Sequence, residues 1–515
     1  MPERSGSAAT TALSPLLVRW LVAAGALSLA LRLAISVTFP ITGDEAFFYW
    51  WGVYPDWGYY DHPPMVGWLI ALMRATLGDT TWAIRLPVVL LPLAIGGLLA
   101  WALSPLDRVR AAWAVLLFWL APINWLNVLI TTDTPLIFWS VLSAALLLRA
   151  ERREKMDGTA WRLYALSGLF LGCAFLSKYF SVILGLTYLV YFALYRRERW
   201  PAFVVLVLCA LPGPAINIAY NMSHGWSNIM FNLYNRNEGA GFEWNKPVLY
   251  LALMVYLVTP IAVWLAWTQR TVLAAASRQH RLLACVVVVP LVFFALLSLK
   301  KVVGLHWVLS FYPFGFALLA FALPLEKLKA CAVGMAVFAA LHVLIVAGLY
   351  ASSLENWKST KLYPQIIRSY KTAEMLQQVV APGVALMAHA YTPASIYGYE
   401  LRTYVPVFGP GNFHARQDDM LVDFSLYQGK TVRIVRMDAP RIEEYQPYFD
   451  SVHVLSFSQD GVPFYAVEGK GFNYAAYKSG VLAPIYSRYY NIPAWLPMTG
   501  CPFCERLCGE VRCTK

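Results

Sequence analysis

Long uninterrupted apolar runs constrain the fold of this 515-residue chain more than any other feature of its sequence. The hydrocarbon core of a membrane is about 30 Å thick and requires roughly 20 apolar residues per helix. About eleven segments approach that length. They are residues 16–38, 83–103, 111–130, 135–149, 162–177, 179–195, 201–221, 248–267, 282–299, 307–323 and 331–350. The sequence therefore predicts an α-helical integral membrane protein with about 11–13 transmembrane helices.

The composition supports this class, because 59% of the residues are hydrophobic and only 14% are charged. The net charge of +12 comes largely from loops that follow every second apolar run, and such loops face the cytoplasm by the positive-inside rule. The amino terminus is then cytoplasmic, and the residues after 350 lie outside. The basic residues are scattered and form no patch interleaved with aromatic residues, so we expect no nucleic-acid partner.

The character of the sequence changes after Tyr350. Residues 384–388, 431–435 and 452–456 alternate between apolar and polar side chains, as short strands do, and residues 371–380 have a helical pattern. The sequence therefore predicts two parts. Residues 1–350 form a membrane domain, and residues 351–515 form a small α/β domain outside the membrane.

Four cysteines crowd the last fifteen residues of the chain. They are Cys501, Cys504, Cys508 and Cys513. An external tail lies in an oxidising compartment, which favours two disulfides. A zinc site of four thiolates and free thiols are the alternatives, although only the spacing of Cys501 and Cys504 is typical of zinc ligands.

Asp44 and Glu45 follow the first apolar run directly and are surrounded by aromatic residues. Carboxylates at the mouth of a membrane helix are costly unless they face water, a partner or a substrate. One interpretation is helix capping, because acidic side chains favour the amino-terminal end of a helix. The other is a general base that accepts a proton from a hydroxyl nucleophile. Asp44 is favoured for that chemistry, because Gly43 before it allows a sharp turn.

A second motif lies at Tyr59-Tyr-Asp-His-Pro-Pro64. Two prolines make a rigid turn, and that alone would explain part of the pattern. A turn does not require Asp61 and His62, however. These side chains are suited to orienting a phosphate or a sugar hydroxyl close to the membrane plane.

A third motif, Thr131-Thr-Asp-Thr-Pro135, connects two apolar runs on the predicted outer side. Asp133 is either the amino-terminal cap of the helix that Pro135 opens or a functional carboxylate, and the two roles are compatible. We expect Asp133 and Asp44 to converge, because both lie at outward helix ends.

Cationic residues on the same predicted side are Lys178, Lys300, Lys301 and His306. Lys178 interrupts an apolar stretch, where it either extends to the interface or meets an anion. The Lys300-Lys301 pair and His306 form a basic cluster on a face where basic loops are disfavoured. A phosphate held at the outer interface would explain this exception.

Taken together, these motifs resemble the bacterial members of the protein O-mannosyltransferase superfamily, which have the GT-C membrane glycosyltransferase fold. Within it they are most similar to the aminoarabinose transferases that modify lipid A. The likeness extends over residues 16–350, with the external domain in addition. It rests on six motifs in order: Asp44-Glu45, Tyr60-Asp-His-Pro-Pro64, Ala83-Ile-Arg-Leu-Pro87, Thr132-Asp-Thr-Pro135, Leu176-Ser-Lys178 and Lys300-Lys301 with His306-Trp307.

The resemblance implies an inverting glycosyltransferase in the cytoplasmic (inner) membrane of a bacterium, with its active site on the outer, periplasmic face. It would use a sugar linked to polyprenyl phosphate and transfer it to a lipid, glycan or protein. Asp44 would be the catalytic base and Asp133 would assist it. The residues that would hold the donor and its phosphate are Glu45, Tyr60, Asp61, His62, Lys178, Lys300, Lys301 and His306. No nucleotide cofactor is implied, and a divalent metal is left open.

The motif at Asp61 and His62 departs from the aminoarabinose transferases, which tend to have Glu-Lys there. Histidine is a weaker phosphate anchor than lysine near neutral pH. Other bacterial relatives carry Asp-His-Pro-Pro and use various sugars and acceptors, so the resemblance leaves both substrates unspecified.

Two other classes of protein share some of these features. A polyprenyl-linked lipid transporter or flippase would also have many helices, but its polar residues usually lie near the midplane in repeated halves. Here the charges gather at outward helix ends and no repeat is evident. A membrane scaffold would explain the external domain but not Lys300, Lys301, Asp61 and His62.

Overall fold

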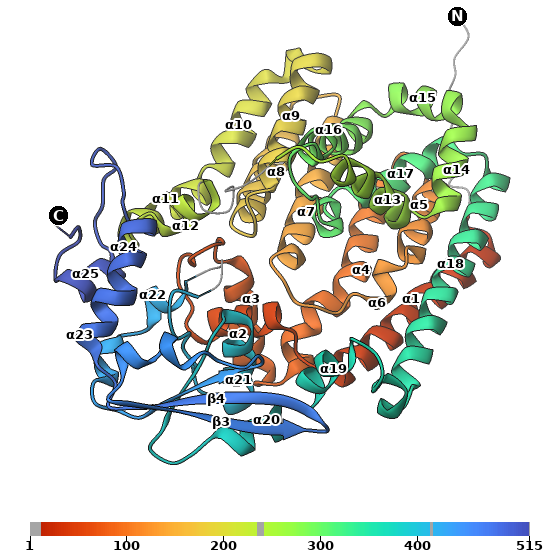
Figure 1. The fold of residues 1–515 in the computed structure, drawn as a ribbon. Helices are drawn as coiled ribbons and strands as arrows, with labels where there is room; N and C mark the ends of the chain where they lie inside the picture. The colour runs from red at the N-terminus through yellow and green to blue at the C-terminus, as the bar shows by residue number, and fades with distance from the viewer. Residues whose placement is uncertain (1–11, 234–240, 412–415, 514–515) are drawn as a thin grey trace, which may run out of the picture. The chain divides into compact units, whose positions relative to one another are not determined.

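The protein is described by a computed structural model that covers residues 12–233, 241–411 and 416–513 (Figure 1). Every one of the predicted apolar segments contains helix. The helices formed by these segments, with α15 between two of them, are α1 (Pro15–Thr38), α4 (Thr81–Leu103), α5 (Arg108–Leu120), α6 (Ile123–Leu126), α7 (Asp133–Glu151), α8 (Gly158–Phe175), α9 (Ser181–Tyr195), α10 (Trp200–Ala210), α11 (Pro212–Ser223), α13 (Asn245–Val258), α14 (Pro260–Thr268), α15 (Arg270–Gln279), α16 (Arg281–Ser298), α17 (Tyr312–Ala322) and α18 (Leu325–Ala351).

Fewer helices are long enough to cross a membrane than the apolar runs predicted. Within the described residues, six qualify by length and composition: α1, α4, α7, the stretch 197–223, α16 and α18. The pair α13 and α14 would make a seventh span, but it is bent by 95°. The break falls at Thr259, whose φ is 78°, and at Pro260, which has no backbone N–H to donate. Apolar composition therefore predicted these helices correctly, and three further apolar helices, α3 (Met65–Leu77), α9 and α17, are shorter than a full span.

The chain forms two compact units, and each of them is made of three separate segments of the sequence. The first unit comprises residues 1–38, 85–214 and 240–351, and the second comprises residues 39–84, 215–239 and 352–515. Segments 39–84 and 215–239, which lie between predicted membrane helices, therefore pack with the carboxy-terminal residues. The second unit is therefore larger than residues 351–515, the domain that the change in composition predicted.

The first unit contains a buried arginine that donates hydrogen bonds to backbone carbonyls of a helix interrupted by proline. Pro92 lies inside α4, so the carbonyl of Val88 has no partner in the helix. The guanidinium of Arg32 donates to that carbonyl and, at 3.2 Å, to the carbonyl of Val89. Arg32 also donates to the carbonyl of Asn124 at 3.1 Å. These bonds explain how a buried cation is tolerated in an apolar helix such as α1.

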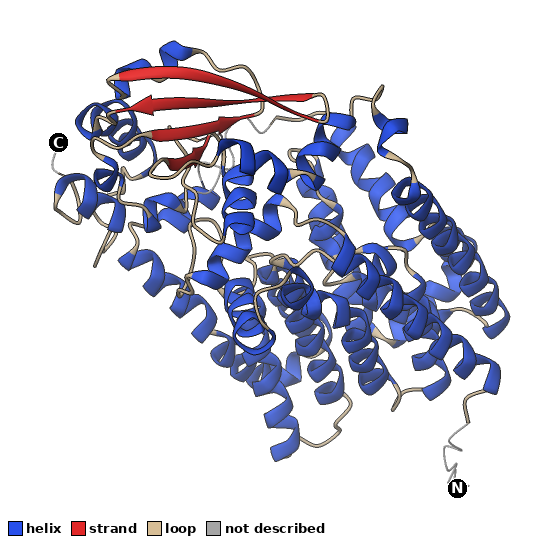
Figure 2. Cartoon of the chain, turned by 90° about the horizontal axis from the view of Figure 1, so that it is seen from below, coloured by secondary structure: helices blue, strands red, loops and turns tan. Residues whose placement is uncertain are grey.

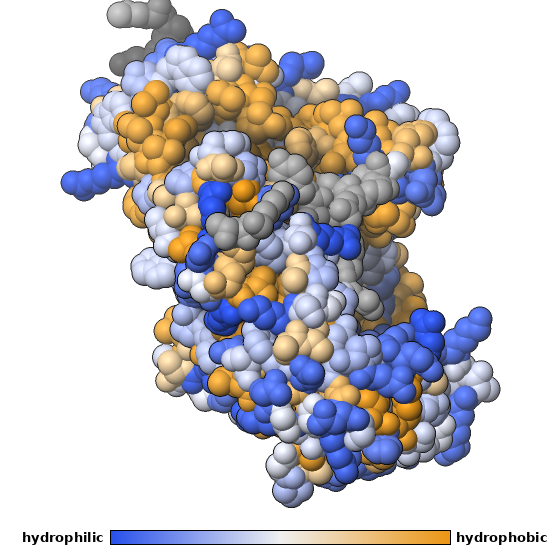
Figure 3. All heavy atoms as spheres, turned by 60° about the vertical axis from the view of Figure 1, so that its left-hand side comes forward, coloured by the Kyte–Doolittle hydropathy of each residue, from blue (hydrophilic) through white to orange (hydrophobic). Residues whose placement is uncertain are grey.

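Many large apolar side chains of the first unit are exposed. On α10, for example, Val204 and Leu208 lie open, and apolar surface of this kind forms the orange areas of Figure 3. A soluble protein rarely exposes large contiguous apolar patches, whereas in a membrane protein the lipid tails cover such surface. This surface agrees with the predicted multi-pass membrane class.

The second unit contains a four-stranded sheet in the order β1-β2-β4-β3 (Figure 2). Strands β1 and β2 are parallel, while β4 is antiparallel to both of its neighbours. The strands are β1 (Ala385–Ala388), β2 (Val432–Arg436), β3 (Ser451–Gln459) and β4 (Val462–Lys470). The helices of this unit are α2 (Gly43–Val53), α3 (Met65–Leu77), α12 (Ser227–Leu233), α19 (Tyr363–Tyr370), α20 (Thr372–Val379), α21 (Tyr391–Leu401), α22 (Asp418–Leu421), α23 (Tyr474–Tyr477), α24 (Ala483–Tyr489) and α25 (Pro502–Cys508).

Helices α20 and α21 supply apolar side chains to the core of the sheet. Leu376 of α20 and Tyr397 of α21 are buried in one cluster with Val435 of β2 and Phe464 of β4. The α/β fold predicted for the carboxy-terminal residues is therefore confirmed. Because α21 follows β1 directly, this sheet also fixes the position of the first turn of α21.

Candidate active site

The first turn of α2 assigns different environments to its two neighbouring carboxylates. Glu45 is fully buried, and its Oε2 accepts hydrogen bonds from the backbone N–H of Thr42 at 3.2 Å and from the Thr42 hydroxyl at 3.1 Å. This is a capping box, which fixes the start of the helix. Asp44 is exposed in the same turn. Capping therefore explains Glu45, and Asp44 keeps an accessible carboxylate.

Tyr391, at the start of α21, contacts Asp44. Its hydroxyl donates to Asp44 Oδ1 at 3.3 Å, and its ring lies 5.2 Å from that of Phe47. Burial raises the pKa of Tyr391, and the charges of Asp44 and Asp61 raise it further. Tyr391 thus stays protonated and able to donate to the carboxylate. The sequence motifs did not indicate this residue.

Gly43 allows α2 to approach α21 closely. A Cβ atom added at Gly43 would lie 2.1 Å from Thr392 Cγ2, so the two helices would have to separate. We expect Gly43→Ala to destabilise the protein by about 1–3 kcal/mol, as overpacking does. Thermal unfolding would measure the loss. Adding Thr392→Ser removes the clashing methyl group and should recover most of the stability, and a double variant no more stable than the single one would contradict this explanation.

Residues 56–62, called the site loop from here on, hold the Asp61-His62 pair in a tight turn. The backbone N–H of Tyr59 donates to the carbonyl of His62 at 3.0 Å, and His62 Nε2 lies 3.7 Å from Asp61 Oδ2. His62 is 8% exposed and packs near Phe48 and Trp51, with ring centroids 6.3 and 6.1 Å away. The aromatic residues of α2 therefore position the imidazole.

Two asparagine side chains of α12 donate hydrogen bonds to the backbone of the site loop. Asn228 Nδ2 donates to the carbonyl of Tyr59, and Asn232 Nδ2 donates to the carbonyl of Asp61, each at 2.8 Å. Tyr60 points into the packed interior, where it is 2% exposed and burial raises its pKa. Its backbone N–H donates to Gln417 Oε1 at 3.0 Å. Tyr60 is therefore placed as a packing residue of the second unit.

In the first unit, Asp133 and Lys178 form a buried ion pair. Lys178 Nζ donates to both carboxylate oxygens of Asp133, at 2.8 and 2.9 Å, and each side chain is 9% exposed. Helix α7 begins at Asp133, and the cap position belongs to Thr132. Asp133 is therefore not the capping residue, and its charge is neutralised by a lysine 45 residues away.

Aromatic rings connect this ion pair to the basic segment 300–306. Lys178 Nζ lies 5.4 Å from the centre of the Phe180 ring, a cation–π distance. Phe180 in turn packs against Trp307 at 4.6 Å, and Trp307 is 6.3 Å from the His306 ring. The structure thus brings Lys178 into the same neighbourhood as His306.

Lys246, on α13, joins the same segment and was missed in the sequence. Its Nζ donates to the backbone carbonyl of Lys300 at 3.4 Å and forms an ion pair with Glu243 at 3.1 Å. Lys300 and His306 are exposed and Lys301 is half-buried. A pattern search could have found Lys246, since it lies close to the predicted outward end of an apolar run.

The predicted site residues therefore form two groups. The second unit holds Asp44, Glu45, Tyr60, Asp61 and His62, and the first holds Asp133, Lys178, Lys300, Lys301 and His306. The convergence of Asp44 and Asp133 stays a prediction, because they belong to different units. Over the described ranges, no three His, Cys, Asp or Glu side chains form a group that could bind a metal ion. The involvement of a divalent metal stays untested.

The four cysteines near the carboxy terminus form two disulfides. Cys501 pairs with Cys504 and Cys508 with Cys513. Of the three alternatives that the sequence left open, the structure therefore has the two disulfides.

The fold defines a membrane protein of the GT-C type, as the sequence motifs predicted. It is similar to that of ArnT from Cupriavidus metallidurans bound to undecaprenyl phosphate, with a TM-score of 0.66, 14% sequence identity and coverage of 87% of this chain and 98% of ArnT. The apo state of the same ArnT gives a TM-score of 0.65 and 16% identity over 88% of this chain and 98% of that one. At these identities the likeness establishes the fold alone.

Sequence comparison gives a narrower match. Residues 61–216 match the family model of dolichyl-phosphate-mannose-protein mannosyltransferase. No curated protein sequence matches the chain. The matched region begins at Asp61 and includes Asp133 and Lys178.

Proposed function

We propose that this chain is a glycosyltransferase that moves a sugar from a polyprenyl-phosphate-linked donor to a lipid, glycan or protein acceptor. The reaction would take place on the outer face of a bacterial cytoplasmic membrane, the side on which the loop charges predict Asp44 to lie. The shared fold supports this proposal, as does the undecaprenyl phosphate bound by ArnT. The family match over residues 61–216 supports the same type of donor.

The observation that carries the proposal is the contrast between Asp44 and Glu45. Glu45 is buried and engaged in capping α2, whereas Asp44 is exposed and accepts a hydrogen bond from Tyr391. A helix cap needs only one of these carboxylates. The other carboxylate, that of Asp44, is accessible, and Tyr391 orients it by a hydrogen bond. A general base needs both properties, because it must reach the proton that it takes.

In the proposed reaction, Asp44 takes the proton from an acceptor hydroxyl. The acceptor oxygen forms a bond to the anomeric carbon from the face opposite the phosphate, so the configuration inverts. The bond between that carbon and the phosphate oxygen breaks, and its electron pair leaves with polyprenyl phosphate. Cations aimed at the departing phosphate stabilise the charge that develops there.

The cations differ in their suitability for that role. Lys178 already donates two hydrogen bonds to Asp133, so its charge is largely compensated. Lys300 and His306 are exposed, and Lys301 lies between them. We therefore assign contact with the leaving phosphate to the 300–306 segment, and we assign to Lys178 the positioning of Asp133.

Mass spectrometry of reaction products tests the proposal. Purified full-length protein would be incubated with a panel of polyprenyl-phosphate sugars and with acceptors extracted from membranes. We expect a sugar-sized mass gain on one acceptor, which would identify both substrates. Folded protein that binds polyprenyl phosphate yet transfers no sugar from any donor would contradict the proposal and favour lipid transport.

A further inference from the structure

The carboxy-terminal tail, residues 497–508, folds back onto the turn between α11 and α12. Both segments belong to the second unit. Four hydrogen bonds join them. The backbone N–H groups of Thr499 and Gly500 donate to the Met222 carbonyl, at the end of α11, at 2.8 and 3.3 Å. Gly225 N–H donates to the Gly500 carbonyl at 3.1 Å, and Trp226 Nε1–H donates to the Pro497 carbonyl at 2.8 Å. The tail is thereby held against a turn that precedes α12 directly.

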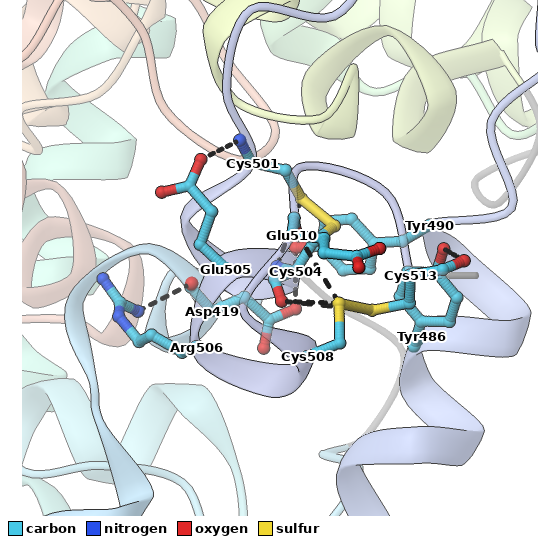
Figure 4. The surroundings of a disulfide bond; sticks show 10 residues. All are labelled: Asp419, Tyr486, Tyr490, Cys501, Cys504, Glu505, Arg506, Cys508, Glu510 and Cys513. Carbon is cyan, nitrogen blue, oxygen red and sulfur yellow. Dashed lines mark hydrogen bonds between the residues drawn. A yellow bond between two sulfur atoms is a disulfide. The ribbon is translucent and has the colours of Figure 1, made fainter.

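The disulfide between Cys501 and Cys504 lies at this junction (Figure 4). Both cysteines are buried, and a Cβ atom added at Gly225 would lie 2.8 Å from Cys501 Sγ. Gly225 and Trp226 both have positive φ angles, 61° and 55°. Such a conformation is unfavourable for tryptophan and persists only where surrounding contacts enforce it. The tail supplies those contacts.

The same turn leads to the site loop through α12. Trp226 N–H donates to the Asn221 carbonyl at 2.8 Å, and α12 begins at the next residue. One turn of α12 separates Asn228 from Asn232, the two residues that donate to the carbonyls of Tyr59 and Asp61. A shift of α12 would therefore move both hydrogen bonds at once.

A second route reaches the site loop through α22. Arg506, in α25 of the tail, donates to the carbonyls of Asp419 at 3.0 Å and Met420 at 2.7 Å, and Figure 4 shows its contact with Asp419. Gln417 precedes that segment and accepts from the backbone N–H of Tyr60. The tail is thus connected to the site loop by two sets of hydrogen bonds, one through α12 and one through α22.

We propose that the tail, fastened by the Cys501–Cys504 disulfide, is a positioning element that holds Asp61 and His62 in place. Its importance for catalysis rests on the proposed function, whereas its effect on the loop does not. The effect is local, because a disulfide between cysteines three residues apart removes little entropy from the unfolded chain. Its loss should loosen the contacts that it orders rather than unfold the protein.

Hydrogen–deuterium exchange on the full-length protein tests this proposal. Three variants would be compared with the wild type: Cys501→Ser with Cys504→Ser, Trp226→Phe, and the control Cys508→Ser with Cys513→Ser. The Trp226→Phe variant removes the indole N–H and part of the ring but leaves both disulfides in place, so it serves if the first variant fails to fold. In the described residues, the Cys513 carbonyl accepts a hydrogen bond from the Tyr486 hydroxyl at 3.2 Å, so this second disulfide is held against α24 rather than against residues 222–226.

In the first two variants we expect exchange in peptides covering 57–62 and 222–233 to become about ten-fold faster, because local opening becomes easier. The control should stay close to the wild type. Where transfer is measurable, KM for the donor should rise more than kcat falls. Faster exchange at 222–233 with unchanged exchange at 57–62 would overturn the proposal, as would no change at either. A wild type that transfers no sugar would refute only the proposed function, since the exchange results stand by themselves.

Discussion

Replacing Asp44 with asparagine is expected to lower the rate of sugar transfer by about 10²–10⁴-fold, the range that general-base catalysis contributes. Asparagine keeps the shape of the side chain and can still accept the hydrogen bond from Tyr391, but it cannot take a proton from the acceptor. Thermal stability should stay close to that of the wild type, because Asp44 is exposed. Initial rates at saturating donor, together with thermal unfolding, would measure the two effects.

Glu45→Gln is the matched control for Asp44→Asn. The variant glutamine retains an oxygen that can accept from Thr42, so α2 should keep its start and transfer should fall far less. If Glu45→Gln abolished transfer and Asp44→Asn did not, the roles assigned to the two carboxylates would be reversed.

The second large effect is expected on stability. Asp133→Asn leaves the Lys178 ammonium buried without its partner, and breaking a buried ion pair in this way costs about 3–5 kcal/mol. Thermal unfolding in detergent should show a marked loss. Adding Lys178→Met removes the stranded charge, keeps the length of the side chain and should restore most of the stability.

Stability and activity together distinguish a structural role of Asp133 from a direct role in catalysis. If Asp133 serves mainly as the partner of Lys178 in the ion pair, Asp133→Asn should lose stability and the double variant should recover it. An Asp133→Asn variant that unfolds like the wild type but transfers no sugar would show instead that Asp133 acts on the substrate directly.

Apolar length predicted where the helices lie better than where they break. The run 248–267 looks continuous, because Thr259 and Pro260 barely lower its hydropathy, yet the helix bends there by 95°. In the carboxy-terminal part, three strands were predicted and β4 was missed. The Asp460-Gly461 turn, with both φ angles positive, connects β3 to β4 and is the sequence signal that would have located it.

The site motifs were recognisable from sequence, but their partners were not. Lys178 and Asp133 are 45 residues apart, and Tyr391 and Asp44 are 347 residues apart. Nothing local in the chain specifies such pairs, because they depend on how α2 packs on α21 and α7 on α8. The different roles of Asp44 and Glu45 likewise required the capping geometry of α2.

The most direct test of the proposed glycosyltransferase activity follows both products in one sample. Protein in proteoliposomes would receive the donor identified in the panel and its acceptor, and mass spectrometry would quantify free polyprenyl phosphate and glycosylated acceptor over time. We expect the two to form in equal amounts with the wild type and at a strongly reduced rate with Asp44→Asn. Donor that crosses the bilayer with its sugar still attached, without release of polyprenyl phosphate, would contradict glycosyl transfer and identify a transporter.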